Sequence, residues 1–213
     1  MKNLEELKKS IDKHKKMKLV VVSAEEDNVL VAVEQAYKDG FIEPILVGDK
    51  KMIEEINKKN SLDFEGVQII AAKDFDEAAE ISVKLVNRGQ ADFLIKGLLD
   101  TSIILKAVLN NEWGLKTGRQ LSHVMLYEIP SYHKLLMLTD GGMVTYPDLD
   151  TKKQLIINAV EAARGLGISP VKVACLAAKE KVNPKMQATI DAQALKEMCD
   201  AGDFGDDVIV EGP

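Results

Sequence analysis

The stretch that decides the fold is Lys18–Ser23, KLVVVS, which has the pattern of a buried strand. Consecutive valines are typical of strands that are covered on both faces, because β-branched side chains pack well on a pleated surface. The next segment, Asp27–Asp39, has the periodicity of a helix, and Gly40 ends it. Strand and helix in short alternation predict a mostly parallel sheet with right-handed crossovers.

The alternation continues outward from this stretch in both directions. Further helices are predicted at residues 4–17, 49–59, 74–89, 101–110, 150–164 and 188–201, and further strands at 45–47, 67–71, 91–95, 123–128, 134–139, 171–177 and 208–210. The short turn between 123–128 and 134–139 predicts that these two strands are antiparallel neighbours. Asp150 is the expected N-cap of the helix that follows it. A loop with glycine, proline and acid at 139–150 predicts a boundary between two α/β domains, 1–140 and 141–213.

Composition and charge narrow the class of protein. The 213 residues are 46% hydrophobic and 29% charged, with a formal net charge of -6, as in many globular enzymes. The excess of acid disfavours nucleic acid and anionic membranes as partners, so an anionic ligand would need a local basic pocket. We expect a cytoplasmic protein, because no apolar run approaches a membrane span and the charged N-terminus does not match a signal peptide.

Chemically useful side chains follow several predicted strands, where ligands bind in open α/β sheets. Lys96 and Gly97 follow the strand ADFLI and are either a phosphate contact or the polar exit of a buried strand. Arg119 lies beside Gly118 before a strand, where its planar fork could bind a phosphate or form a loop salt bridge. Asp140, followed by two glycines, could orient a ligand or form a turn.

Other side chains carry weaker signals. Ser122 and His123 are adjacent at the start of a predicted strand, where neighbouring side chains point to opposite faces, which argues against a Ser-His couple. Arg88 and Arg164 lie at helix ends, where a cation complements the dipole. Cys175 and Cys199 lack C-x-x-C spacing and predict buried free thiols. We predict no metal site.

Familiar nucleotide and hydrolase motifs are absent from the sequence. It contains no G-x-G-x-x-G after the first strand, no Walker A sequence, no H-E-x-x-H and no G-x-S-x-G. The common nucleotide-dependent oxidoreductases and kinases are therefore disfavoured.

Several longer segments, taken in order, resemble one enzyme family. They are KGLLDTSIILKAVLN (96–110), GLKTGRQLSHVMLYEIPSYHKLLMLTDGGM (114–143), PDLDTKKQLIINAVEAARGLG (147–167), VKVACLAAKEKVNPKMQATIDAQALKEM (171–198) and DVIVEGP (207–213). Together they resemble the phosphate acetyl/butyryltransferase family, nearer to its phosphate butyryltransferase branch. The likeness extends over nearly the whole chain.

The resemblance implies a fold and an activity. The expected fold is α/β, with two domains that have mostly parallel sheets, helices on both faces and a cleft between them, as in the isocitrate/isopropylmalate dehydrogenase architecture. The expected reaction reversibly converts acyl-CoA and phosphate into acyl phosphate and coenzyme A. The expected assembly is a homodimer or a higher oligomer. Coenzyme A and phosphate are then substrates, and no further cofactor is implied.

The resemblance also assigns expected roles to single residues. Arg119, Lys96 and the adjacent Gly97 become candidates for phosphate or coenzyme A contacts, and Ser122 and Asp140 become candidate cleft residues. Lys106 is a weaker candidate, because related acetyltransferases carry an arginine in the equivalent helix.

The sequence DDVIVEGP at 206–213 raises a further expectation. In the family, the strand that ends in Val-Glu-Gly-Pro leads into another helix and strands, with a Ser-Arg pair and an Asp that are associated with catalysis. We therefore expect a fragment with an incomplete second domain, with its base in the missing segment and little activity by itself.

Two alternatives remain open at this stage. One is another enzyme on the same architecture, either a phosphate acyltransferase of lipid synthesis or a metal- and NAD-dependent dehydrogenase. The other is a noncatalytic domain that binds coenzyme A. Acyl chain length does not follow from the sequence, because pocket width depends on how side chains pack.

Overall fold

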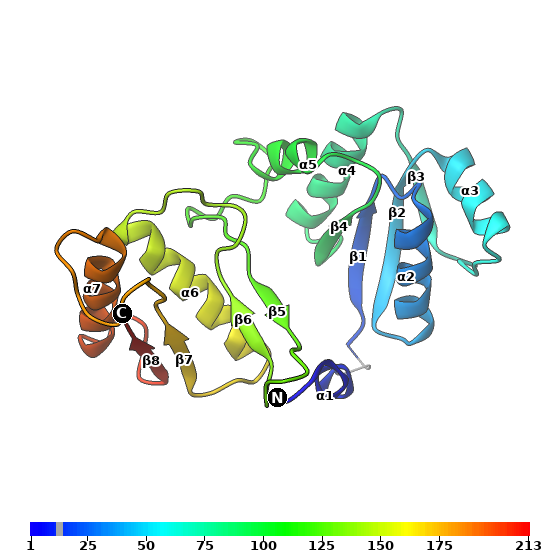
Figure 1. Ribbon diagram of the computed structural model, residues 1–213. Coiled ribbons are helices and arrows are strands. Elements are labelled where there is room, and N and C mark those ends of the chain that lie inside the picture. Colours follow the sequence, from blue (N-terminus) through cyan, green and yellow to red (C-terminus); the bar gives the residue numbers. More distant parts are fainter. Residues whose placement is uncertain (12–14) are drawn as a thin grey trace. The chain divides into compact units, whose positions relative to one another are not determined.

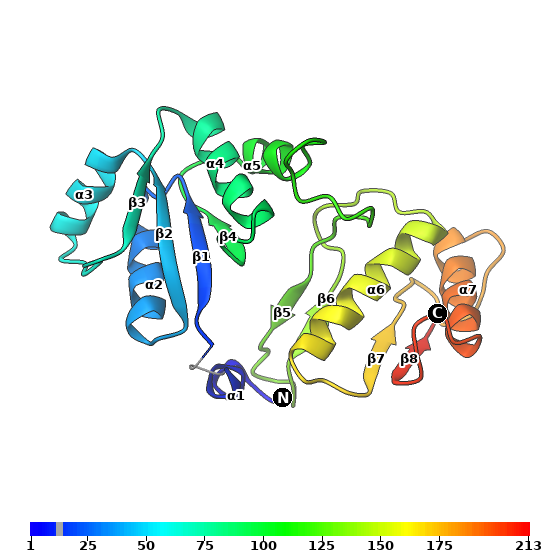
Figure 2. The same cartoon turned by 180° about the vertical axis from the view of Figure 1, so that it is seen from behind.

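A computed structural model describes residues 1–11 and 15–213 of the chain (Figures 1 and 2). The chain divides into two compact units: the first unit is Ile11–Gly118, and the second unit is Met1–Ser10 together with Arg119–Pro213. This division does not coincide with the predicted one at residue 140. The reason is that residues before 140 pack with residues after it, since Met137 contacts the apolar cluster around Ile156.

The first unit is built on a parallel sheet of four strands in the order β3-β2-β1-β4. The strands are β1 (Met17–Val22), β2 (Ile42–Gly48), β3 (Gln68–Ala71) and β4 (Phe93–Lys96). The helices between and after them are α2 (Asp27–Lys38), α3 (Lys50–Lys59), α4 (Phe75–Asn87) and α5 (Thr101–Val108). In the centre of the sheet, Val20 of β1 lies opposite Ile45 on one side and Leu94 on the other. The predicted α/β class with mostly parallel strands is confirmed.

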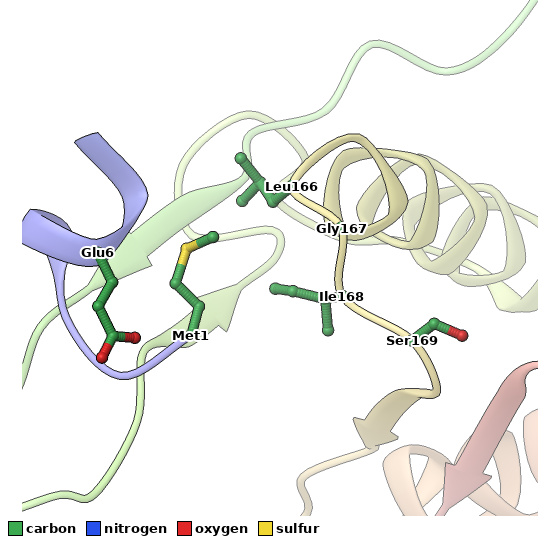
Figure 3. A pocket seen from close by; sticks show the side chains of 6 residues that line it. All are labelled: Met1, Glu6, Leu166, Gly167, Ile168 and Ser169. Carbon is green, nitrogen blue, oxygen red and sulfur yellow. The ribbon is translucent and has the colours of Figure 1, made fainter. Parts of the chain in front are cut away.

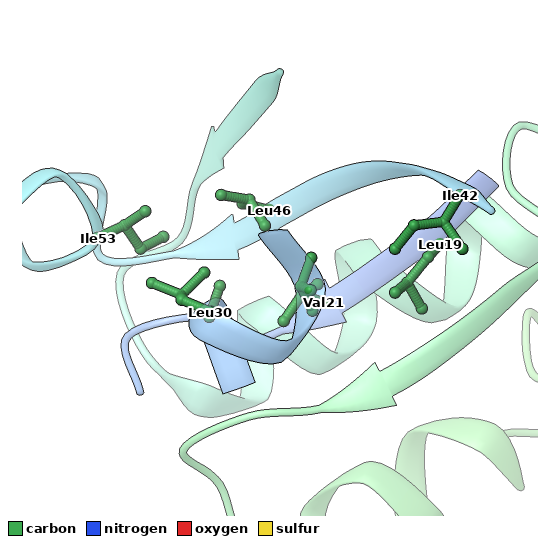
Figure 4. Close-up of a cluster of buried hydrophobic side chains, with 8 residues drawn as sticks. Leu19, Val21, Leu30, Ile42, Leu46 and Ile53 are labelled. Carbon is green, nitrogen blue, oxygen red and sulfur yellow. The ribbon is translucent and has the colours of Figure 1, made fainter. Parts of the chain in front are cut away.

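Residues 19–22 of β1 are buried on both faces, which explains the run of valines. Leu19 and Val21 pack with Leu30 of α2 and Ile53 of α3 (Figure 4). The alternate residues of the strand face the other layer, where α4 contributes Ala78 and Ala79 and α5 contributes Ile104. Successive side chains of a strand point to opposite faces, so a strand between two helical layers has no position for a polar residue.

The second unit contains an antiparallel pair and a parallel pair of strands. Its elements are α1 (Leu4–Ser10), β5 (Met125–Tyr127), β6 (Leu136–Leu138), α6 (Leu149–Gly165), β7 (Val171–Ala174), α7 (Gln187–Asp200) and β8 (Val208–Glu211). The predicted antiparallel pairing is confirmed, with Met125 opposite Leu138. Strands β7 and β8 are parallel. Ile156 and Val160 of α6 pack with Leu195 of α7 and with Phe204 to form the core.

Some predicted boundaries were wrong. Helix α1 ends at Ser10 instead of residue 17, and residues 12–14 of the predicted helix lie outside the described residues. The N-cap of α6 is Asp148, whose carboxylate accepts a hydrogen bond from the Thr151 N–H at 2.8 Å. Asp150 lies inside the first turn, where its charge complements the helix dipole. Strand β7 ends at Ala174, so Cys175 follows the strand.

Within the described ranges, every helix is too short or too polar to span a membrane.

Gly97 lets the chain after β4 cross directly over the end of β1. Its N–H donates to the Val22 carbonyl at 2.7 Å, and the next N–H, of Leu98, donates to the Ser23 carbonyl at 2.8 Å. A Cβ atom added at Gly97 would lie 2.1 Å from the Ser23 carbonyl oxygen, far inside van der Waals contact. Packing therefore requires glycine at this position.

We expect Leu30→Ala to lower the free energy of unfolding of the first unit by about 2–5 kcal/mol, because it opens a cavity at a site with no exposed surface. Val31 is the next residue of α2 and is 46% exposed, so Val31→Ala should cost less than about 1 kcal/mol. Trp113, the one tryptophan of the chain, packs in the first unit, so urea unfolding followed by its fluorescence reports on this unit. Equal losses for the two variants would contradict the assigned core.

Gly97→Ala should destabilise the protein by about 1–3 kcal/mol, since the added methyl group must displace the Ser23 backbone. Gly165→Ala is the control, because a Cβ at that position meets no atom within 4 Å and the residue ends a helix. Thermal melting followed by circular dichroism should show a lower midpoint for the first variant and an unchanged or slightly higher midpoint for the second. A Gly97→Ala protein as stable as the parent would refute the packing role.

Candidate functional site

The sequence-predicted site residues are divided between the two compact units. Lys96, Gly97 and Lys106 belong to the first unit, and Arg119, Ser122 and Asp140 belong to the second. Each unit therefore presents its own set of candidates.

In the first unit, Lys96 is the last residue of β4 and lies at the carboxyl edge of the parallel sheet. Its ammonium group donates to the Leu99 carbonyl at 3.0 Å and more weakly to the Gly97 carbonyl at 3.5 Å. These contacts brace the loop that follows the strand. Lys106 is exposed in the last turn of α5, where a cation complements the helix dipole.

In the second unit, Arg119 forms an ion pair with Glu161 of α6. The Nη1 atom donates to the Glu161 carboxylate at 2.7 Å, and both side chains are about half exposed, at 52% and 53%. The hydrogen bond raises the pKa of the Arg119 guanidinium and lowers the pKa of the Glu161 carboxyl. Water screens an exposed pair of this kind strongly, so the pair contributes little to stability.

The segment Arg119–Ser122 has no helix or strand of its own, and side chains of α6 hold it in place. The Gln120 N–H donates to the Gln154 side-chain oxygen at 2.7 Å. The Asn158 side-chain nitrogen donates to the Gln120 carbonyl at 2.8 Å and to the Ser122 hydroxyl oxygen at 2.8 Å. With the Arg119–Glu161 pair, these contacts secure three of the four residues of the segment.

Sequence reasoning missed this polar face of α6. Gln154, Asn158 and Glu161 are spaced four and three residues apart, which places them on one side of a helix. The apolar residues of the same helix that enter the core, among them Ile156 and Val160, lie on another side. The signal was therefore present as a polar stripe with helical spacing, but such a stripe normally faces solvent, so nothing in the sequence singled it out.

Asp140 holds the turn that follows β6. Its carboxylate accepts hydrogen bonds from the backbone N–H groups of His123 at 3.0 Å, Gly142 at 2.8 Å and Met143 at 2.8 Å. Partial burial raises the pKa of the Asp140 carboxyl, but the three N–H donors outweigh this effect and keep the pKa below its ordinary value. A carboxylate that accepts three hydrogen bonds from the backbone is a poor general base. Of the two predicted roles of Asp140, these contacts fit the formation of a turn.

Ser122 and His123 have separate partners. The Ser122 hydroxyl contacts Asn158, whereas the backbone of His123 contacts Asp140. Both cysteines are free thiols, as predicted, but they are half-buried instead of buried, and burial raises the pKa of the Cys175 thiol. Within the part of the chain that the structure describes, no group of three or more His, Cys, Asp and Glu side chains could hold a metal ion.

A surface pocket of about 360 Å³ in the second unit has none of the six candidates in its lining. Its lining residues are Met1, Glu6, Leu166, Gly167, Ile168 and Ser169 (Figure 3). The pocket is formed where the N-terminal segment meets the connection between α6 and β7. Glu6 is the one lining residue with an ionisable side chain.

The chain is similar to known proteins along nearly its whole length. The family described as phosphate acetyl/butaryl transferase matches residues 2–84 and 71–213. The chain is 40% identical over 212 residues to a phosphate butyryltransferase of Clostridium beijerinckii, covering 100% of this chain and 70% of that protein. It is 41% identical over 202 residues to a phosphate butyryltransferase of Clostridium acetobutylicum, covering 94% of this chain and 67% of that protein.

A solved structure gives the same result. The branched-chain phosphotransacylase of Enterococcus faecalis V583 superposes with a TM-score of 0.75 at 30% sequence identity, covering 92% of this chain and 68% of that chain. The two sequence relatives and the solved structure thus each match more than nine tenths of this chain. This protein belongs to the phosphate acetyl/butaryl transferase family.

Proposed function

We propose that the protein is an acyltransferase that moves an acyl group, such as butyryl, between coenzyme A and inorganic phosphate. The observation that carries the proposal is the segment Arg119–Ser122, where α6 holds a half-exposed arginine next to a hydroxyl group. The segment belongs to a chain 40% identical to a phosphate butyryltransferase. A planar guanidinium is well suited to binding phosphate oxygens in pairs.

The reaction sets clear demands on such a site. A phosphate oxygen attacks the thioester carbonyl carbon, a C–O bond forms, the C–S bond breaks, and the sulfur leaves as a thiolate that takes up a proton. Phosphate must be held against the carbonyl, and cations must offset its charge. Arg119 uses Nη1 to bind Glu161, and the other N–H groups of its fork can serve the phosphate.

The proposal includes the remaining expectations for substrates and assembly. Acyl-CoA and phosphate act as substrates, and no additional cofactor or metal is part of the reaction. Lys96, Gly97 and Lys106 remain proposed contacts of the first unit for phosphate or coenzyme A, and Ser122 and Asp140 remain proposed cleft residues. We further propose that the enzyme acts in the cytoplasm as a homodimer or a higher homo-oligomer.

The direct test is an assay of the 213-residue chain with butyryl-CoA and phosphate. Coenzyme A binding is measured first by calorimetry, and turnover is measured next. We expect saturable binding and a release of coenzyme A thiol that requires phosphate. A chain that does not bind coenzyme A would contradict the proposal, and so would thiol release that is unchanged when phosphate is omitted.

Arg119→Ala should weaken phosphate binding at least about tenfold, because a charge-assisted contact is removed. Arg119→Lys should restore only part of this loss, since an ammonium group cannot bind two oxygens in the plane of a fork. The control is Arg88→Ala, an exposed arginine at the C-cap of α4 in the first unit, which should change phosphate binding less than about twofold. Equal effects of Arg119→Ala and Arg88→Ala would exclude a specific phosphate contact at Arg119.

A further inference from the structure

Asn158 of α6 makes two contacts with the segment Arg119–Ser122 through a single nitrogen atom. Its Nδ2 lies 2.8 Å from the Gln120 carbonyl oxygen and 2.8 Å from the Ser122 Oγ. A backbone carbonyl can only accept, so the atom that faces it must be the amide nitrogen. An amide nitrogen has two hydrogens, and the two contacts use both.

This arrangement restricts the direction of the Ser122 hydroxyl hydrogen. Because Oγ accepts a hydrogen bond from Asn158, its own hydrogen must point away from that N–H group. Among residues 1–11 and 15–213, the hydrogen bond found at the Ser122 hydroxyl is the one that it accepts from Asn158. Ser122 therefore presents a hydrogen-bond donor that is oriented by α6 and left for an external acceptor.

The neighbouring contacts keep the segment in the same place. The Gln154 side-chain oxygen accepts the Gln120 N–H, so both backbone polar groups of Gln120 are bound to α6. Arg119 is anchored to the same helix through Glu161. The segment thus holds an arginine and a serine hydroxyl three residues apart, and both are donors of the kind that phosphate oxygens accept.

We propose that Asn158 is a positioning residue that orients the Ser122 hydroxyl to donate to an anionic phosphate oxygen. The oxygen belongs either to inorganic phosphate or to a phosphate group of coenzyme A. The inference rests on the proposed function and adds Asn158 to it. Asn158 does not touch the substrate in this arrangement and acts through Ser122.

The test uses Asn158→Asp, which keeps the size and shape of the side chain and removes both amide hydrogens. The new carboxylate accepts the Ser122 hydrogen and so takes it from the ligand, and it also faces the Gln120 carbonyl. We expect the dissociation constant to rise about tenfold or more, as for the loss of a hydrogen bond to a charged group. Inorganic phosphate and coenzyme A are titrated separately by calorimetry, and the ligand whose binding weakens identifies the source of the oxygen.

Gln193→Glu on α7 is the matched control. It makes the same change from amide to carboxylate in the same unit, and it also removes a donor, since the Gln193 side chain donates to Glu197 at 2.7 Å on an exposed surface. Its effect on either dissociation constant should be less than about twofold. Thermal melting of both variants checks that they fold, and Asn158→Ala provides a second variant that lacks the donors without adding a charge.

A double-mutant cycle separates positioning from a general loss of structure. Ser122→Ala should weaken binding about tenfold, and Ser122→Ala combined with Asn158→Asp should weaken it little more than Asn158→Asp alone, because both changes remove the same donor. The proposal is overturned if Asn158→Asp and Asn158→Ala bind as the parent does, or if the effects of the two changes multiply. If the parent chain binds neither phosphate nor coenzyme A, the proposed function itself fails, and this inference fails with it.

Discussion

The burial of β1 between two layers of helices is the constraint on which the first unit depends. Val20, Val21 and Val22 have no exposed surface, so each face of this strand must be covered by its own helices. Parallel neighbours on both sides require crossover connections, and these place the end of every strand at the same edge of the sheet. Lys96 and Gly97 lie at this edge because β4 ends there.

Helix α6 has a corresponding role in the second unit, because it serves two surfaces at once. Its apolar side, with Ile156 and Val160, forms the core together with α7 and β7. Its polar side, centred on Asn158, secures a segment that has no ladder of backbone hydrogen bonds to hold it. The same packing that stabilises the unit therefore determines where Arg119 and Ser122 are held.

The fold was predictable where a single physical pattern dominates the local sequence. The valine run of β1 and the antiparallel pair β5 and β6 were found because periodicity and turn length depend on neighbouring residues. Boundaries were less predictable. Asp148 and Asp150 are both good caps by composition, and only the backbone geometry decides which carboxylate reaches the Thr151 N–H. The division between the units was also missed, since it depends on contacts such as that of Met137 with the α6 core.

The sequence by itself determined the α/β class, the parallel strands of the first unit and the family, because these follow from local periodicity and from motifs in a fixed order. It also drew attention to Arg119 and Asp140 as unusual residues in loops. Only the tertiary structure decided that the Asp140 carboxylate is occupied by three backbone N–H groups and that Asn158 directs the Ser122 hydroxyl. Hydrogen-bond partners that are 36 residues apart leave no trace in local patterns, since packing alone brings them together.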